Sequence, residues 1–292
     1  MSVFLQLLIN GLIAGSIYSL VAAGFSLTYS VNKFMNFAHG AMIAFSGYMM
    51  FNFFSKYRQG FVLAFLLAIL CTAALGLAAD FLVYRQLRKR KASTTIQLIA
   101  SLALLTMINS CILLFFSSDV RSIKIANPVY IVMDARITMV QAVIILTAIL
   151  MMAVLWLVAF KTKIGKAMRA ISDNKEVAQT VCINPEKIYL SCALISSVLA
   201  GIGGVLIGIE QNLYPQMGVM LIVKGFAATV MGGLGLIQGT IFGSYLLGMV
   251  ENFGIWYLPS GYKDAISFVL LFLFLLFRPY GIFGKKRRED VA

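Results

Sequence analysis

The sequence predicts an all-α protein, a polytopic bundle of about eight to nine membrane-spanning helices that forms one transmembrane domain over residues 1–292. Hydrophobic residues fill 61% of the 292 positions and charged residues 12%, whereas soluble domains carry charge on about a quarter of theirs. Mean hydropathy is +0.91. Long stretches lack Asp, Glu, Lys and Arg, and each can cross about 30 Å of hydrocarbon as a helix of about 20 residues. They are residues 1–32, 92–118, 137–160, 188–209 and 225–250.

Apolar runs between polar breaks place nine helices. They are expected at residues 5–28, 36–54, 61–84, 94–116, 138–160, 187–209, 217–233, 237–257 and 264–280. The first run stays apolar too long for a cleaved signal peptide, so it counts as a span. The separation of the seventh helix from the eighth depends on the glycines of residues 232–235, which cost about 1 kcal/mol each in a helix relative to alanine and permit a tight turn.

The basic residues predict the orientation. With the polar segment 161–187 inside, 17 Lys and Arg residues lie in the inner segments and six in the outer ones. Basic residues accumulate on the cytoplasmic side of membrane proteins, so we expect the N-terminus outside and the C-terminus in the cytoplasm. The net charge of +13 therefore reports topology, and no nucleic-acid partner is expected; the lipid bilayer is the expected surrounding.

Small residues recur at every fourth position in three predicted helices. Close backbone approach along such stripes is a main source of packing energy between helices in lipid. We therefore expect these helices at the centre of the bundle, either as plain packing or as surfaces that shift to open a path. The packing positions are Gly11 and Gly15 in the first helix, Ala200, Gly204 and Gly208 in the sixth, and Gly235, Gly239 and Gly243 in the eighth.

Polar side chains within the predicted spans are candidates for the pathway or its gate, because ionisable groups in a membrane are costly and usually paired or functional. Lys224 either extends its ammonium to the surface or pairs with Glu210 or Glu251. The only histidine, His39, is expected to hydrogen-bond within the bundle behind a helix cap at Asn36, or to line the pathway. The pathway or gating candidates are Asn10, Tyr18, Asn36, His39, Lys224 and Glu251.

The sequence contains no motif of a catalytic, nucleotide-binding or metal-binding site. Nucleotide-binding motifs of the GxxxxGK[ST] type and HExxH metalloprotease motifs are absent, and one histidine with few acids does not make a polar active site. The four cysteines have no CxxC spacing, so we predict neither a disulfide framework nor a metal site. No catalytic residue, bound metal or cofactor is expected in this chain.

The polar segment 161–187 is predicted to hold a short helix at about 174–183. Asp173 precedes Glu176 by three residues, as in a capping box, and Asn184 and Pro185 suit the start of the next span. The small apolar face suits a groove on another protein, although a basic loop on anionic lipid headgroups is the alternative. The predicted docking residues are Asp173, Asn174, Lys175, Glu176, Val177, Ala178, Val181 and Cys182, of which Val177, Ala178, Val181 and Cys182 share the apolar face.

Three stretches resemble successive signatures of the branched-chain amino acid permeases, the membrane subunits of ABC importers. They are NGLIAGSIYSLVAAGFSLTYSVNKFMNFAHG, IGKAMRAISDNKEVAQTVCINPEK and LIVKGFAATVMGGLGLIQGTIFGSYLLGMVE, and the resemblance covers nearly the whole chain in the family's order. One departure is Cys182, where the family usually has glycine before the Ile-Asn pair.

The resemblance implies a multi-pass protein of a bacterial inner membrane whose segment 161–187 is a coupling loop. It implies three kinds of protein partner: a second homologous permease subunit, a pair of cytoplasmic ATPase subunits, and a periplasmic binding protein. ATP and magnesium would be bound by the ATPase subunits. The alternative is a self-sufficient secondary transporter or channel for a small polar solute, such as an amide or urea. A mostly apolar path with few polar groups would suit such a solute as well as an aliphatic amino acid.

Overall fold

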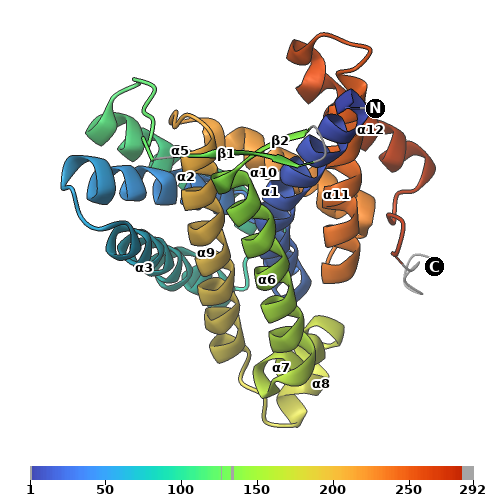
Figure 1. The fold of residues 1–292 in the computed structure, drawn as a ribbon. Helices are drawn as coiled ribbons and strands as arrows, with labels where there is room; N and C mark the ends of the chain where they lie inside the picture. The colour runs from blue at the N-terminus through green and yellow to red at the C-terminus, as the bar shows by residue number, and fades with distance from the viewer. Residues whose placement is uncertain (1, 126, 133–134, 285–292) are drawn as a thin grey trace.

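The computed structural model describes residues 2–125, 127–132 and 135–284, and most of them are helical (Figure 1). The helices are α1 (Ser2–Asn32), α2 (Ala38–Met50), α3 (Phe61–Ala79), α4 (Arg85–Lys89), α5 (Thr94–Phe116), α6 (Met139–Lys161), α7 (Lys163–Asp173), α8 (Lys175–Thr180), α9 (Pro185–Glu210), α10 (Met217–Gly232), α11 (Ile237–Gly254) and α12 (Lys263–Phe277). Two π-helical segments, η1 (Phe51–Lys56) and η2 (Asp80–Tyr84), extend α2 and α3, and a 3-10 turn, η3 (Ser260–Tyr262), precedes α12.

The nine predicted helices all have a counterpart, but the predicted number of spans is not confirmed. Within the described residues, five helices are long and apolar enough to cross a membrane, or six if α10 and α11 count as one broken span. The five are α1, the continuous run of α3, η2 and α4, and α5, α6 and α9. Helix α10 has 16 residues, about 24 Å at 1.5 Å per residue, which is less than the hydrocarbon thickness.

The predicted break between α10 and α11 is confirmed. The chain direction changes by 116° there, and Gly233 and Gly235 have φ values of 116° and 81°, which L side chains rarely adopt. The turn lets the two helices pack closely: a Cβ atom built on Gly239 would lie 2.3 Å from the carbonyl oxygen of Gly232. The assignment of Gly235 to a helix-packing stripe is wrong, because Gly235 lies in the turn before α11 begins.

Helices α1 and α9 lie at the centre of the bundle, as their small residues predict. In their most apolar stretches 78% of α1 residues and 72% of α9 residues are buried, against 28% to 33% in the other three candidate spans. Added Cβ atoms at Gly11 and Gly15 would lie 2.7 Å and 2.6 Å from side chains of α11. In α9, Gly204 and Gly208 face α2, and Ala200 is fully buried.

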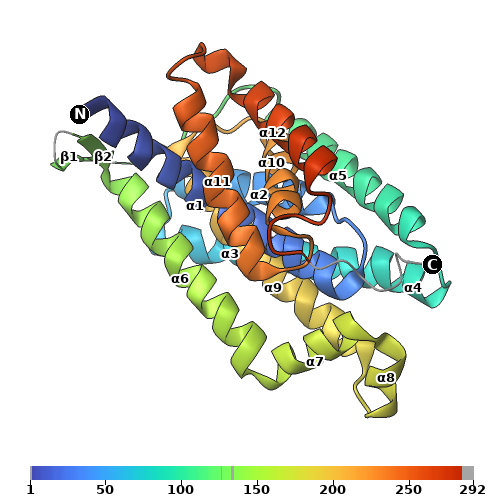
Figure 2. The ribbon, with the colours of Figure 1, turned by 90° about the vertical axis from the view of Figure 1, so that its right-hand side faces the viewer.

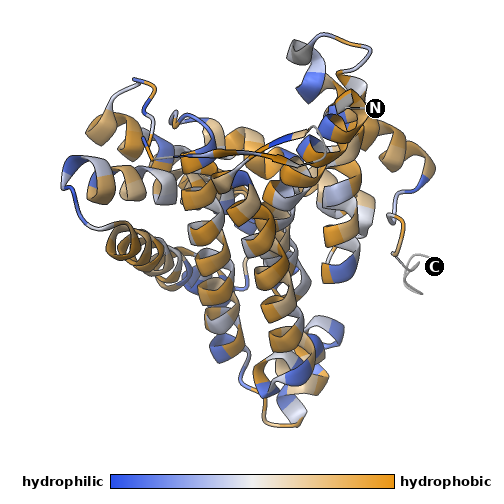
Figure 3. Ribbon diagram, viewed as in Figure 1, coloured by the Kyte–Doolittle hydropathy of each residue, from blue (hydrophilic) through white to orange (hydrophobic). Residues whose placement is uncertain are grey.

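The two ends of the bundle differ in the elements they carry. In Figure 2 the long helices run diagonally, with the start of α1 and the strands at one end and α4, α7 and α8 at the other. Figure 3 shows hydrophilic residues gathered on α7 and α8 and in the connecting loops, while the long helices are mostly hydrophobic. The end that carries α4, α7 and α8 is the one that the basic residues predict to be cytoplasmic; the last basic cluster, at 285–288, lies outside the described residues.

A short β-hairpin corrects the all-α prediction locally. Strands β1 (Val129–Val132) and β2 (Ala135–Thr138) pair antiparallel, with Val129 opposite Thr138 and Val132 opposite Ala135. Their β-branched and aromatic residues favour strands, and the pairing gives their backbone N–H and C=O groups hydrogen-bond partners. The amide of Gln6 in α1 bonds both backbone groups of Arg136, at 3.1 Å and 2.8 Å, and so fixes the hairpin to the bundle.

Candidate functional site

The polar segment 161–187 contains two helices where the sequence predicts one. Helix α7 was missed, although its 11 residues bury Gly165, Met168 and Ile171 on one face. Helix α8 is six residues long, shorter than the expected ten, and its cap differs from the prediction. The Asn174 side-chain oxygen accepts from the backbone N–H groups of Glu176 at 2.9 Å and Val177 at 3.1 Å, whereas Asp173 belongs to the end of α7.

The predicted docking residues divide into a buried and an exposed set. Val177 and Val181 are 59% and 64% exposed, and Cys182 is exposed beside them. Ala178 is only 2% exposed and packs toward the chain, so the four apolar residues do not form one outward face. Polar side chains are exposed at Asn174, Lys175 and Glu176. Val177 and Val181 are therefore exposed apolar side chains within an otherwise charged segment.

Cys182 ends α8 in a left-handed conformation. Its φ is 60°, in the region that glycine adopts without strain and that costs a residue with a Cβ atom about 1–2 kcal/mol. The backbone N–H of Cys182 donates to the carbonyl of Gln179 at 3.0 Å, and that of Ile183 donates to Ala178 at 3.1 Å. The family that the chain resembles usually has glycine at this position, and glycine would adopt the same left-handed turn without strain.

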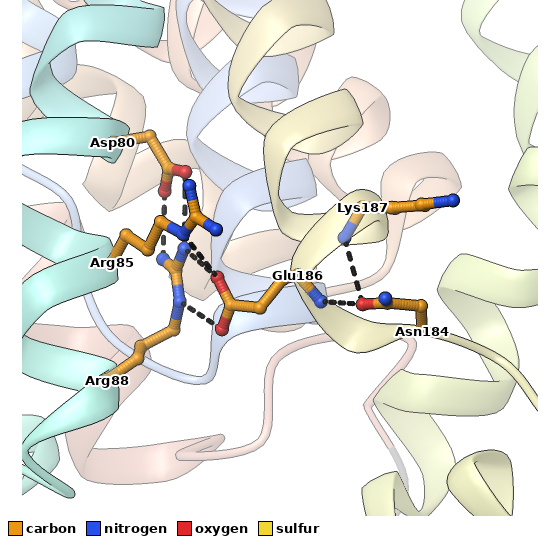
Figure 4. Close-up of polar contacts among 6 residues, drawn as sticks. All are labelled: Asp80, Arg85, Arg88, Asn184, Glu186 and Lys187. Atoms are coloured by element: carbon orange, nitrogen blue, oxygen red, sulfur yellow. Dashed lines mark hydrogen bonds and ion pairs between the residues drawn. The ribbon is translucent and has the colours of Figure 1, made fainter.

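The start of α9 agrees with the predicted cap. The Asn184 side-chain oxygen accepts from the N–H groups of Glu186 at 3.0 Å and Lys187 at 3.4 Å, and Pro185 occupies the first turn (Figure 4). Proline has no N–H group and a fixed φ, so it suits a helix start. Helix α8 ends at Thr180 and α9 begins at Pro185, so only residues 181–184 separate them.

An ion-pair network that sequence analysis missed joins this turn to η2 and α4 (Figure 4). The guanidinium of Arg88 donates to both carboxylate oxygens of Asp80 at 2.8 Å and 3.2 Å, and to those of Glu186 at 3.3 Å and 3.0 Å. The side chains of Arg88 and Asp80 are only 8% and 5% exposed, and the guanidinium lies 4.6 Å from the ring centre of Tyr189. We name Asp80, Arg88 and Glu186 the Arg88 brace.

One signal in the sequence points to the brace. Asp80 is an acid within an otherwise uncharged run at 61–84, and buried acids in membrane helices are usually paired. Its partner cannot be read from spacing alone, because Glu186 lies 98 residues from Arg88 along the chain. Arg85 adds a longer contact to Glu186 at 4.0 Å.

A second buried network lies at the other end of the bundle. Lys224 of α10 pairs with Glu251 of α11 at 3.2 Å, one of the two predicted partners, and with Asp264 of α12 at 2.8 Å. Tyr18 of α1 accepts from Lys224 at 3.2 Å and donates to Glu251 at 2.5 Å. Ser267 also donates to Glu251, which is completely buried. This network joins four helices, so its first role is to hold the bundle together.

Of the remaining pathway candidates, Asn36 and Asn10 form side-chain hydrogen bonds, whereas His39 forms none that the described residues show. The prediction that Asn36 caps α2 is wrong. Its side-chain oxygen accepts a hydrogen bond from the Tyr84 hydroxyl at 2.8 Å instead. His39 is buried against Gly24, where an added Cβ would lie 2.4 Å from the imidazole. The predicted hydrogen bond of His39 is not found, because neither ring nitrogen has a partner at normal geometry among the described residues. Asn10 accepts from Gln6 at 3.1 Å.

Nearly the whole chain is similar to permeases of branched-chain amino acid transport systems. The family described as "Branched-chain amino acid transport system / permease component" matches residues 7–275. The high-affinity branched-chain amino acid transport system permease protein BraD of Pseudomonas aeruginosa is 31% identical over 99% of this chain and 98% of its own length. The corresponding LivH protein of Escherichia coli is 32% identical over the same shares. A probable LivH permease of Methanocaldococcus jannaschii is 30% identical over 96% of this chain and 92% of its own length.

One solved structure shares the fold. PsaBC from Streptococcus pneumoniae in complex with Fab aligns with a TM-score of 0.51 at 13% identity, over 93% of this chain and 91% of that one. At this identity the likeness shows the fold alone.

Together, the helical bundle and these relatives define a multi-pass membrane permease, a transport component rather than an enzyme. The chain belongs to the branched-chain amino acid transport system permease family.

Proposed function

We propose that the chain conducts branched-chain amino acids (Leu, Ile, Val) inward across the membrane as the permease subunit of an ATP-driven importer. In this proposal the N-terminus lies outside and α7 and α8 lie in the cytoplasm of a bacterial inner membrane. A second homologous permease, two cytoplasmic ATPase subunits and a periplasmic binding protein complete the transporter. This chain binds no cofactor, and ATP and magnesium are held by the ATPases.

One observation carries the proposal: the exposed apolar tip of α8 within a charged segment. Val177 and Val181 contribute its exposed side chains, and the rigid cap at Asn184 ties α8 to the central helix α9. A partner that binds this tip and moves with ATP can therefore shift α9. Because α9 packs through small residues on its neighbours, two alternative arrangements of the bundle differ by small displacements.

The experiment replaces the apolar tip with a charge. We expect Val181→Asp to abolish uptake of labelled leucine in cells that carry the neighbouring transporter genes, because a desolvated carboxylate in an apolar groove has no partner. Gln179→Asp is the matched control, since Gln179 is also exposed on α8 and is already polar. Membrane insertion of both variants is checked by immunoblot of washed membranes. Uptake by an inserted Val181→Asp protein at the wild-type rate would refute the docking of α8.

The rival, a self-sufficient secondary transporter or channel, is tested by energy supply. Its typical feature is an acid buried in the bundle and free to relay ions or protons, whereas the buried Glu251 is held by Lys224, Tyr18 and Ser267. We expect the full transporter in liposomes to accumulate leucine only with ATP, and this chain alone not to accumulate it. Concentrative uptake by the isolated chain under an ion gradient would favour the rival.

A further inference from the structure

A polar pocket opens at the end of the bundle where α1 begins. Its volume is about 320 Å³, within the range of small-ligand sites, and residues of α1, α6, α9, α11 and α12 line it. By the charge distribution this is the end that faces outward, where a solute delivered from outside first meets the permease. Two of the predicted pathway residues, Asn10 and Tyr18, are part of its wall.

One wall of this pocket is apolar and rigid. Ile13, Ala14 and Ile17 of α1 line it, and each is less than 9% exposed. Behind them α1 packs against α11 through glycines, so the wall has little freedom to move. Tyr18 fixes the inner end of the wall through its bond to Glu251. Such a surface suits a short branched aliphatic side chain.

Two opposite charges line the same pocket without pairing. Glu210 ends α9 and Lys263 begins α12, and neither forms a salt bridge with any residue that the structure describes. Gln141 donates to one carboxylate oxygen of Glu210 at 2.8 Å and leaves the other available. Lys263 makes one long bond, at 3.5 Å to Asn252, although an ammonium group has three donors.

We propose that this pocket binds the zwitterion of an aliphatic amino acid, with its ammonium at Glu210, its carboxylate at Lys263 and its side chain on the apolar wall. The assignment rests on the proposed transport function and gives it a binding site in this chain. A ligand with both charges can bridge two groups that do not reach each other. Urea or an amide carries neither charge and gains from neither group.

The pocket would also select a zwitterionic amino acid over an uncharged solute, which a purely apolar channel could not do. A zwitterion enters a membrane protein at the cost of desolvating two charges, and a site with one group for each charge offsets that cost. The nearby Lys224 cannot serve, because Glu251 and Asp264 already hold it at 3.2 Å and 2.8 Å. Glu210 and Lys263 are the acidic and the basic side chain that line this pocket, and among the residues the structure describes neither is held by a salt bridge.

The test measures ligand binding to the purified full chain in lipid nanodiscs by saturation-transfer difference NMR. The probes are leucine, leucinamide, which lacks the carboxylate, and 4-methylpentanoate, which lacks the ammonium. We expect Glu210→Gln and Lys263→Met each to weaken leucine binding by about tenfold or more, the loss of one charge-assisted contact. Lys263→Met should not weaken leucinamide further, and Glu210→Gln should not weaken 4-methylpentanoate further.

Three controls keep the result interpretable. Lys263→Arg retains the charge and should retain leucine binding. Asp119→Asn and Lys124→Met neutralise exposed charges outside the pocket and should bind as the wild type does. Wild-type affinity in both pocket variants, or an equal loss for all three probes, would overturn the site. The proposed function fails separately: it falls if the assembled transporter does not import leucine with ATP, whatever the binding pattern is.

Discussion

At the scale of single residues, removing one partner of the buried Lys224–Glu251 pair should destabilise the fold more than removing both partners. Glu251 is completely buried, and the Lys224 side chain is 10% exposed. Deleting one partner of a buried pair leaves a charge without compensation, which costs about 3–5 kcal/mol, while replacing both costs far less. The stability of the α1, α10, α11 and α12 contact therefore depends on the pair, not on either charge.

We expect Lys224→Met to lower the thermal unfolding temperature of the purified protein in detergent sharply. The double variant Lys224→Met with Glu251→Gln should regain most of the loss, because no buried carboxylate is left without a partner; Asp264, the other partner of Lys224, is 48% exposed and reaches water. Lys89→Met, which removes an exposed charge, is the matched control. A double variant that is less stable than Lys224→Met would contradict the pairing.

Cys182 offers a second prediction at this scale, because its φ of 60° strains any residue that has a Cβ atom. A β-branched side chain is strained more. We expect Cys182→Val to raise the rate of tryptic cleavage in the segment 161–187 by about tenfold, since about 1.4 kcal/mol of added strain shifts local opening by that factor. Cys182→Gly should be cleaved no faster than the wild type. Equal rates for the valine variant and the wild type would show that the turn opens for another reason.

At the scale of elements, the helices could be predicted because charge and apolar length mark them directly. The expected 94–116 coincides with α5, and the glycine turn between α10 and α11 lies where the sequence places it. Helix α7 was missed because basic residues conceal its narrow apolar face, and the hairpin was missed because its strands are four residues long. The brace of Asp80, Arg88 and Glu186 needed tertiary structure, since no local rule pairs residues about a hundred positions apart.

The tight packing of α9 on α2 gives a prediction with a neighbouring control. A Cβ atom on Gly204 would lie 2.2 Å from the carbonyl oxygen of Ile43, and backbone cannot yield as a side chain does. On Gly203 the nearest atom would lie 3.5 Å away, an ordinary contact. We expect Gly204→Ala to reduce the yield and thermal stability of the folded protein, and Gly203→Ala to leave both unchanged or improved. The comparison fails if the two variants behave alike.

At the scale of the whole molecule, the Arg88 brace connects the proposed docking helix to two separate parts of the bundle. Glu186 lies in the first turn of α9, next to α8, while Asp80 and Arg88 belong to the run of α3, η2 and α4. The buried Arg88 guanidinium holds Glu186, whose side chain is 38% exposed, through two hydrogen bonds, and such a fork fixes the geometry better than a single contact does. Any displacement of α8 therefore reaches α9 directly and the α3 to α4 run through Glu186.

This connection predicts that transport can be separated from ATP hydrolysis. We expect Glu186→Ala, in the transporter reconstituted with its ATPase subunits, to lower leucine uptake several-fold while ATP hydrolysis continues, because the α3 to α4 run no longer follows α8. The substitution leaves Arg88 paired with Asp80 at 2.8 Å and keeps the backbone N–H that Asn184 caps, so the fold is preserved. Lys187→Ala is the control, since its side chain is exposed in the same helical turn. The measurement is the ratio of leucine imported to ATP hydrolysed. A ratio equal to that of the wild type would show that the brace is structural only, and a parallel loss of hydrolysis and uptake would place Glu186 in the docking of the ATPase itself.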